Sequence, residues 1–413
     1  MKKSTLYYIF IALITVAVIS IVMLMPYEVN NAVSLKTQRL ITKTTVEPKR
    51  LYIMAWRKIR DEYIDPEMNG QDWNKWKKRY LPYIKTNEDV YVAINTMLQS
   101  LDDPYSRFMN IPEFENQNTI IDSKISGIGI NIISIAGKLV ISNVIENSPA
   151  QKAGLKEGDI IVSINGINTE GISLEEAVKR IRGPEKTPVT IQVSRNGQKI
   201  IKDMDKSIIK LRNVKYLISK DNYAYIQITS FMGVSAPQEF QIALNKTKNT
   251  KGLILDLRGD AGGLLNNSII MANMIVNQGR IVSVVYRNGQ VINMNAQSMA
   301  FYPKKPIVIL INKGTASSSE ILTGALRDNC NAILVGKNTY GKNSIQKVIP
   351  LPNQTGMNLT IAKYLMPNNE DIYKTGIKPD YNVSFTKIDY ANNKDPQFQK
   401  AKELLKNMMK NNK

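Results

Sequence analysis

Two runs of large apolar residues most constrain what this chain can fold into. Leu253 to Leu255 and Ile307 to Ile311 contain no polar residue, which is typical of strands buried on both faces of a sheet. Each run is followed by a glycine-bearing loop and then by a helical pattern, so residues 223–364 are expected to alternate strands with helices. Ligands of α/β folds bind beyond the carboxyl ends of such strands. The two loops are therefore the first places to look for a site.

In the rest of the chain, apolar residues recur at other spacings. From Leu51 to Leu101 apolar residues recur at helical spacing, which predicts a small helical domain. Residues 120–205 contain short β-rich runs separated by Asn-Gly turns, with one helix over Leu174 to Ile181 opened by Ser173 and Glu176 as a capping box. We expect an α/β core, with a mixed sheet and helices, and an inserted β-rich domain. The expected boundaries are 1–26 for a cytoplasmic stub and transmembrane anchor, 27–48 for a linker, 49–115 for the helical domain, 116–205 for the β-rich domain, 206–390 for the α/β core and 391–413 for a basic helix.

The N-terminal segment predicts a membrane anchor. Leu6 to Met25 is an uncharged stretch long enough to cross a bilayer as a helix, and Lys2 and Lys3 before it favour a cytoplasmic N-terminus. A cleaved signal peptide is the alternative, with a small-residue site at Ala32 to Ser34. Either way the rest of the chain is expected beyond the cytoplasmic membrane, in the periplasm or outside the cell.

Composition narrows the chemistry. The 413 residues include no His and one Cys, so catalytic triads with His, imidazole-bound zinc and intramolecular disulfides are excluded. A hydrolase with this amino-acid composition would use Ser with Lys, paired carboxylates or a metal ion bound by oxygen atoms. The net charge of +20 could attract nucleic acid, but the lysines are spread along the chain, so we predict no nucleic-acid partner and only a milder attraction to anionic lipid.

A serine-rich loop follows the second apolar run. Residues 313–319 read Lys-Gly-Thr-Ala-Ser-Ser-Ser before a helical pattern at 320–327. Ser317 and Glu320 have capping-box spacing, so an ordinary helix cap explains this segment when it is taken alone.

A second glycine-bearing loop, at 336–343, gives the serine a candidate base. It nearly matches the phosphate-binding pattern of P-loop triphosphatases, which is the rival hypothesis. Asn343 replaces the hydroxyl residue of that pattern, and residues 344–350 alternate like a strand where a P-loop would open a helix. Read as a strand, the segment puts Lys342, Ser344 and Gln346 on one face. A serine needs a base, and without His the Ser-Lys pair is the main choice. Because a lysine has an ordinary pKa near 10.4, such a site must bury it; a surface lysine is the alternative.

The loop after the first apolar run could stabilise negative charge. Asp256 to Leu264 contains paired glycines, whose backbone can turn N–H groups toward one point, as an oxyanion hole requires. An ordinary strand-to-helix turn is the alternative.

These segments together resemble the carboxy-terminal processing (tail-specific) serine proteases, over nearly the whole chain after residue 50. The serine-to-lysine interval of 25 and the lysine-to-glutamine interval of 4 follow from positions 317, 342 and 346 and match that family. The other segments that carry the resemblance are Gly252 to Arg258, Leu101 to Ser106, Gly127 to Ile130 with Ser148 to Ala150 and Ala153 to Leu155 as in its PDZ module, and Gly376 to Asp380.

The resemblance implies a role for each matching residue. Ser317 would be the nucleophile, Lys342 the general base and Gln346 its orienting partner, with the N–H groups of Gly263 and Ser318 as oxyanion hole. No metal, nucleotide or other cofactor is implied.

Substrate choice would come from the PDZ-like module. Such modules capture the C-termini of proteins or peptides as an added strand, here at Gly127, Ile128, Gly129 and Ile130; a β-bulge is the other interpretation of the two glycines. Arg182 is a weaker candidate for a link between this module and the protease core.

Departures from the family pattern and further partners complete the expectations. Asp260-Ala261 stands where the family has Asn-Pro, and Asn343 stands where it has Gly. An activating adaptor protein and a homo-oligomer are further partners to test, and a catalytically silent, membrane-tethered PDZ scaffold is the alternative from another functional class.

Overall fold

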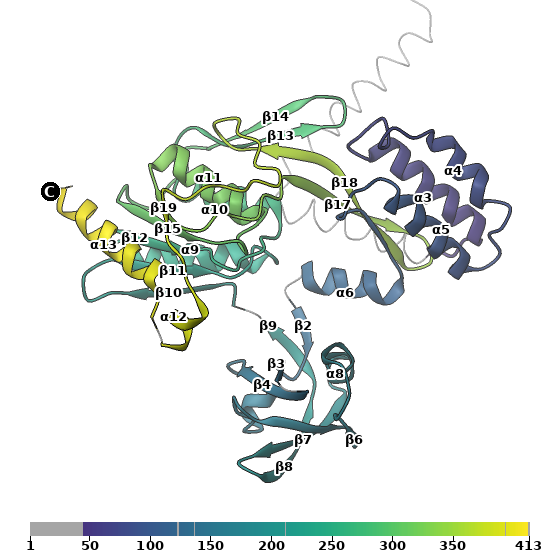
Figure 1. The fold of residues 1–413 in the computed structure, drawn as a ribbon, viewed down its shortest axis with the longest axis horizontal. Helices are drawn as coiled ribbons and strands as arrows, with labels where there is room; N and C mark the ends of the chain where they lie inside the picture. Colours follow the sequence, from purple (N-terminus) through teal and green to yellow (C-terminus); the bar gives the residue numbers. More distant parts are fainter. Residues whose placement is uncertain (1–43, 122–123, 136, 211, 393, 412–413) are drawn as a thin grey trace, which may run out of the picture. The chain divides into compact units, whose positions relative to one another are not determined.

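The computed structural model describes residues 44–121, 124–135, 137–210, 212–392 and 394–411. The predicted anchor at Leu6 to Met25 lies outside the described residues. Within these ranges, no helix is long and apolar enough to cross a membrane. The described chain divides into two compact units. Their helices and strands are labelled in Figure 1. The first holds residues 44–115, 285–290 and 344–363, and the second holds the remainder.

The first unit joins N-terminal helices to a strand hairpin from late in the chain. Its elements are α3 (Pro48–Glu62), α4 (Trp73–Tyr80), α5 (Asn87–Gln99), β1 (Arg107–Met109), β17 (Ser344–Leu351) and most of β18 (Thr355–Leu365). β18 pairs antiparallel with both β1 and β17. Leu51, Ala55 and Ile59, which share one face of α3, pack in one core with Met357 and Leu359 of β18. The predicted helices therefore bury their apolar faces against a distant hairpin.

Helix α6 (Ile111–Ile121) leads to the β-rich domain of the second unit. The strands of this domain are β2 (Lys124–Gly127), β3 (Ile130–Ile135), β4 (Lys138–Val144), β5 (Ile160–Ile164), β6 (Ile167–Asn168), β7 (Pro188–Arg195), β8 (Gln198–Asp205) and β9 (Ser207–Lys210), and its helices are α7 (Pro149–Lys152) and α8 (Leu174–Ile181). The main sheet has the order β3-β4-β5-β7-β8, so β3 is an edge strand, and α8 packs near it. The helix predicted over 174–181 is confirmed, and the Ser173 hydroxyl accepts the Glu176 N–H.

A mixed sheet forms the centre of the second unit. Its strands in spatial order are β10 (Val214–Ile218), β11 (Ala224–Ile228), β12 (Leu253–Asp256), β15 (Ile307–Ile311), β16 (Ile333–Gly336) and β19 (Tyr381–Asn382). β10 is antiparallel to β11, and every other neighbouring pair is parallel. All residues of β12 and β15 are buried, as the continuous apolar runs predict.

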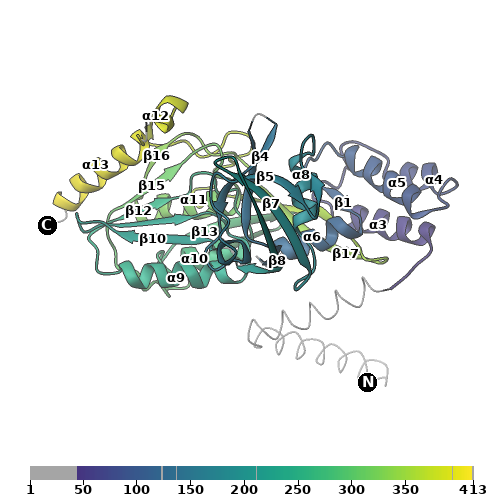
Figure 2. The same ribbon diagram turned by 90° about the horizontal axis from the view of Figure 1, so that it is seen from below.

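Helices cover both faces of this sheet. They are α9 (Ser235–Thr247), α10 (Leu265–Asn273), α11 (Ser318–Cys330), α12 (Lys387–Ala391) and α13 (Pro396–Asn411). Along the chain, a hairpin of β13 (Arg280–Tyr286) and β14 (Val291–Asn295) lies between α10 and β15. The predicted C-terminal helix is confirmed as α13, whose Ala401 and Leu405 pack on Ile254, Val308 and Leu310. Figure 2 shows α13 on one side of the strands and α9 on the other. This arrangement leaves the loops at the carboxyl ends of the parallel strands to form a site.

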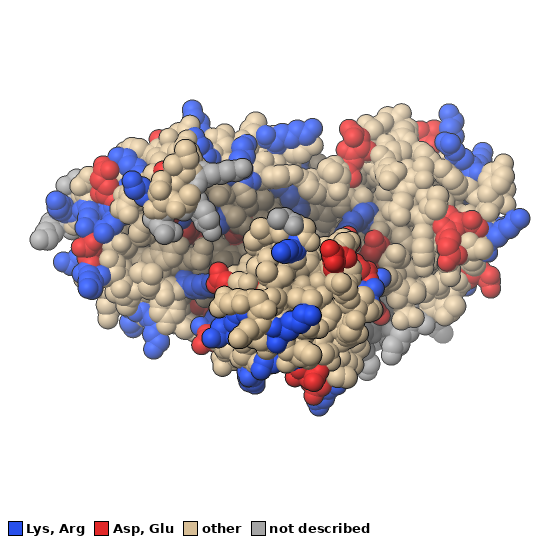
Figure 3. Space-filling model, turned by 60° about the horizontal axis from the view of Figure 1, so that its bottom comes forward, with Lys and Arg blue, Asp and Glu red and all other residues tan. Residues whose placement is uncertain are grey.

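The surface charge is dispersed. On the face in view in Figure 3, Lys and Arg side chains lie scattered among uncharged surface and Asp and Glu side chains, and they form no continuous stripe. This distribution agrees with the spread of lysines along the sequence.

Candidate active site

Loops from neighbouring parallel strands meet at one edge of the central sheet. The Ala316 N–H of the loop after β15 donates to the Asp260 carbonyl of the loop after β12, at 3.0 Å. On its other side the Thr315 carbonyl accepts the Tyr340 N–H from the loop after β16, at 2.9 Å. The parallel register of β12, β15 and β16 therefore brings the serine loop between the glycine loop and the lysine loop.

Ser317 lies at a strained turn between β15 and α11. Its φ is 56° and its ψ is −120°, a backbone conformation that non-glycine residues rarely adopt. Such strain persists only where the surroundings enforce it, and it is common at catalytic residues. Ser317 remains partly exposed while the residues on both sides of it are buried. Its side chain is therefore accessible from outside the helix end.

Glu320 fixes the backbone of both reactive candidates. Its carboxylate accepts the N–H of Ser317 at 2.8 Å and the N–H of Lys342 at 3.0 Å, together with the Gly341 N–H and the Thr339 hydroxyl. The side chain is fully buried, and burial raises the pKa of Glu320 while these donors oppose the rise. The predicted cap at Glu320 is real, but this carboxylate also joins the serine loop to the lysine loop.

Tyr364 holds the same two residues through their carbonyl groups. Its hydroxyl lies 3.3 Å from the carbonyl oxygen of Ser317 and is also hydrogen-bonded to the carbonyl oxygen of Lys342. The ring is almost completely buried. Ser317 and Lys342 are thus each held through N–H by Glu320 and through C=O by Tyr364.

Asn343 fixes the lysine loop through its side chain and its carbonyl group. Its Nδ2 donates to Asp371 Oδ1 at 2.8 Å, and its carbonyl accepts the Tyr364 N–H at 2.9 Å. Among the described residues with positive φ, Asn343 does not appear, so its position requires no left-handed backbone. A side-chain anchor takes the place of glycine flexibility at this position.

Close packing explains the paired glycines. Gly262 has φ 91°, and a Cβ there would lie 2.6 Å from the Ala316 oxygen and 2.8 Å from the Ser318 nitrogen. At Gly263 a Cβ would meet the Phe231 backbone at 2.4 Å. In the described chain neither the Gly263 N–H nor the Ser318 N–H donates a backbone hydrogen bond. The two predicted oxyanion donors are thus available beside Ser317.

Gln346 lies in the first unit, on β17. Its Nε2 donates to Ser344 Oγ at 2.9 Å and to Thr360 Oγ1 at 3.0 Å. The strand begins at Ser344, after Lys342, and its pairing shifts between Ile345 and Gln346. The hydrogen bond brings the Ser344 and Gln346 side chains together although the register shift interrupts the period of two between them, and Lys342 lies outside the strand.

The predicted tail-binding residues border the edge strand β3. Gly127 ends β2, Ile128 is fully buried, and Ile130 begins β3. Gly129 has φ 80°, and a Cβ there would lie 2.3 Å from Ser148 Cβ. The Gly129 carbonyl accepts the Ile145 N–H at 2.9 Å, so this glycine forms a fixed turn into the edge strand.

Arg182 makes a contact of its own near this domain. Its Nη1 lies 3.4 Å from Asn116 Oδ1, on the segment that enters the β-rich domain.

Sequence reasoning assigned no role to Tyr364 or to the ion pair of Arg258. Arg258 binds Asp256 on its own loop and Asp395 before α13, with N···O distances of 2.7 and 2.9 Å. The motif containing Asp256 and Arg258 was the available signal for this pair. A tyrosine among β-forming residues gives no comparable signal.

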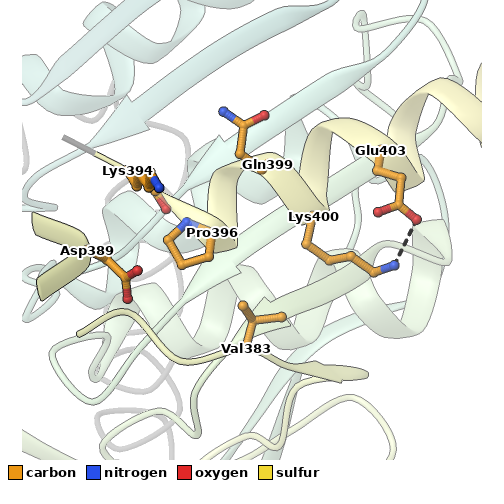
Figure 4. Close-up of a pocket in the computed structure, with 8 residues that line it drawn as sticks. Val383, Asp389, Lys394, Pro396, Gln399, Lys400 and Glu403 are labelled. Carbon is orange, nitrogen blue, oxygen red and sulfur yellow. Dashed lines mark hydrogen bonds and ion pairs between the residues drawn. The ribbon is translucent and has the colours of Figure 1, made fainter. Parts of the chain in front are cut away.

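A pocket elsewhere in the second unit lies apart from the candidate catalytic residues. An open pocket of about 590 Å³ beside α13 is lined by Val383, Asp389, Lys400 and Glu403 among others, and Lys400 pairs with Glu403 on its wall (Figure 4). It includes none of the candidate catalytic residues. No group of Cys, Asp and Glu side chains in the described ranges is arranged to hold a metal ion.

Comparison with known proteins assigns the class. Residues 222–383 match peptidase family S41, residues 140–195 match a PDZ domain, and residues 45–98 match the tricorn protease C1 domain. The chain is 35% identical to the carboxyl-terminal-processing protease of Synechocystis, over 87% of each chain. It is 37% identical to the carboxy-terminal processing protease CtpA of Bacillus subtilis, over 75% of this chain and 67% of the relative.

A solved structure agrees with these sequence matches. The photosystem II D1 C-terminal processing protease superposes with a TM-score of 0.57 at 27% identity, covering 82% of this chain and 94% of that one. The fold and these similarities define a serine protease with a PDZ domain. The chain belongs to the carboxyl-terminal-processing proteases of peptidase family S41. The family resemblance inferred from the motifs is confirmed.

Proposed function

We propose that this protease cuts protein substrates after capturing their C-terminal tails, with Ser317 as nucleophile and Lys342 as general base. The observation that carries the proposal is the double restraint on these two residues, through N–H by Glu320 and through C=O by Tyr364. Fixed geometry between nucleophile and base is what efficient proton transfer requires. Gln346 is proposed to orient the lysine amine.

The proposed reaction proceeds in two steps. Ser317 Oγ attacks the scissile carbonyl carbon while neutral Lys342 Nζ takes the hydroxyl proton, and the carbonyl electron pair moves to oxygen. The N–H groups of Gly263 and Ser318 stabilise that oxyanion. Collapse of the intermediate expels the amine, which takes the proton from Lys342, and leaves an ester on Ser317. Lys342 then takes a proton from water as the water oxygen attacks the ester carbonyl. It returns that proton to Ser317 Oγ as the bond between the acyl carbon and Oγ breaks, and the carboxylic acid product leaves.

The PDZ domain is proposed to select the substrate. An extended tail would pair with the free edge of β3 and place its carboxylate at the N–H groups around Gly127 to Ile130. The edge position of β3 and the nearby α8 support this assignment.

We propose that proteolysis takes place outside the cytoplasmic membrane. The uncharged run from Leu6 to Met25, preceded by Lys2 and Lys3, supports a single-pass anchor with the protease on the far side.

Cleavage of an unfolded reporter with an apolar tail tests the dyad. Ser317→Ala and Lys342→Ala should each abolish cleavage, and Lys342→Arg should not restore it, because a guanidinium group stays protonated. Ser319→Ala is the comparison variant. It removes a hydroxyl bond to the Asp260 carbonyl of 3.1 Å, so it should lower stability by about 1 kcal/mol and leave measurable cleavage. Activity that survives Ser317→Ala would refute the assignment.

A further inference from the structure

Asp260 is an unusual residue in the glycine loop. Its side chain is fully buried. Oδ1 accepts the Gly262 N–H at 2.8 Å, whereas Oδ2 has no hydrogen-bond partner within the described residues. A buried carboxylate oxygen without a partner is costly, and proteins usually avoid that cost by keeping the group protonated. Burial raises the pKa of Asp260 to about 7, against the opposing effect of the Gly262 N–H and the Ser319 hydroxyl.

The backbone of Asp260 ties together the two loops of the proposed oxyanion hole. Its carbonyl accepts the Ala316 N–H at 3.0 Å and the Ser319 hydroxyl at 3.1 Å. Its carboxyl fixes the N–H of Gly262, and the next peptide unit carries the Gly263 N–H. That peptide unit is held from its other side, because the Gly262 carbonyl accepts the Phe231 N–H at 3.0 Å. Ionisation of the Asp260 carboxyl group would therefore place a negative charge on a residue whose hydrogen bonds position the proposed oxyanion donors.

We propose that Asp260 is a positioning residue that supports turnover only while its carboxyl group is protonated. The inference rests on the proposed function of Gly263 and Ser318 as oxyanion donors. A neutral carboxyl adds no charge near the oxyanion that forms on the substrate. A buried carboxylate repels that oxyanion and demands further hydrogen-bond donors, which would distort the glycine loop.

No charged side chain named on the neighbouring elements would balance a negative charge on Asp260. On the loop of Asp260 itself, Arg258 is paired with Asp256 and Asp395. On the serine loop Lys313 is exposed, and on α11 the Glu320 carboxylate faces the 339–342 segment. Lys342 must be neutral to act as a base, so it carries no charge in the working form. The Asp260 carboxylate is then uncompensated while the oxyanion forms.

The pH dependence of kcat in the full chain tests the proposal. For the wild-type protein, kcat on a tail peptide should fall as pH rises past about 7, where the Asp260 carboxyl group loses its proton. In Asp260→Asn the amide keeps an acceptor for the Gly262 N–H and cannot ionise, so the falling limb should disappear. The ratio of kcat for Asp260→Asn to kcat for wild type should increase on the order of tenfold between neutral and alkaline pH. Glu157→Gln, which removes an exposed carboxylate, should retain the wild-type profile.

Each alternative outcome has a distinct meaning. A wild-type profile with no falling limb, or a constant ratio across pH, would overturn the role of Asp260. If Asp260→Asn does not fold, Asp260→Ser offers a hydroxyl acceptor without a titrating group and must show the same loss of the limb. If Ser317→Ala remains active, it is the proposed function that fails. An inactive Ser317→Ala with unchanged pH profiles in the Asp260 variants would reject only the present inference.

Discussion

Tyr364 and Glu320 restrain the same two residues, Glu320 through their N–H groups and Tyr364 through their carbonyl groups. Tyr364→Phe removes one hydroxyl that is hydrogen-bonded to the carbonyl groups of Ser317 and Lys342. We expect kcat to fall by roughly tenfold with KM little changed, because positioning is lost while substrate contacts remain. Steady-state kinetics on a tail peptide measure this split.

The control for that variant is Tyr373→Phe, whose ring is 47% exposed. It should leave both kinetic constants unchanged. A rise in KM alone in Tyr364→Phe would assign Tyr364 to substrate binding instead of positioning.

Sequence reasoning found some residues of the site and missed others for a physical reason. Ser317, Lys342 and the paired glycines stand at loops whose spacing is visible along the chain. Tyr364 is visible only in three dimensions, since its partners are backbone carbonyls 47 and 22 residues away. Glu320 was readable as a cap, but its bond to the Lys342 N–H depends on how β15 and β16 pair.

At the scale of elements, the turn into β3 makes tail recognition testable. Ser317→Ala full-length protein, which cannot consume its ligand, should bind a peptide acid more tightly than the matching C-terminal amide, by about tenfold or more. Gly129→Ala should remove the preference, since its Cβ would meet Ser148 at 2.3 Å.

Gly166→Ala is the matched control for the turn. It places alanine at φ 77° with open space around it, so it imposes similar backbone strain without the clash, and the preference should remain. If the Ser317→Ala protein with Gly129 unchanged binds the peptide acid and the peptide amide equally well, the PDZ domain does not recognise the C-terminal carboxylate.

Secondary structure was largely predictable because its signals are local. The apolar runs became β12 and β15, and the capping serine at 173 opened α8 at the expected residue. The face shared by Lys342, Ser344 and Gln346 was only partly correct. The strand begins at Ser344 and has a register shift between Ile345 and Gln346, and Lys342 belongs to the loop that Glu320 fixes.

At the scale of the whole molecule, the pairing of strands that are distant in sequence determines which elements pack together, and the periodicity of apolar residues does not. The N-terminal helices were expected as a domain of their own, and they instead share a core with β17 and β18, the first of which begins only at Ser344. The helical spacing identifies which face of α3 is buried but carries no information about its partner. Only the strand register brings that partner into place.

Membrane topology is a property of the complete chain. Under the proposed topology, in which Lys2 and Lys3 keep the N-terminus inside, a reporter that is active only outside the cytoplasm and is fused after residue 50 should be active. Fractionation of the full-length protein separates the two routes, since an anchored chain stays with membranes and a cleaved one does not. A silent reporter together with a soluble full-length protein would contradict both.

The central claim is that Lys342 activates Ser317, and covalent labelling tests it most directly. A fluorophosphonate, which reacts with an activated serine hydroxyl, should modify the wild-type protein at Ser317 and at no other serine, as located by peptide mass spectrometry. Lys342→Ala and Lys342→Arg should remain unlabelled while retaining the fold. Labelling at Ser318 or Ser319, or labelling of Lys342→Arg at the wild-type rate, would contradict the account.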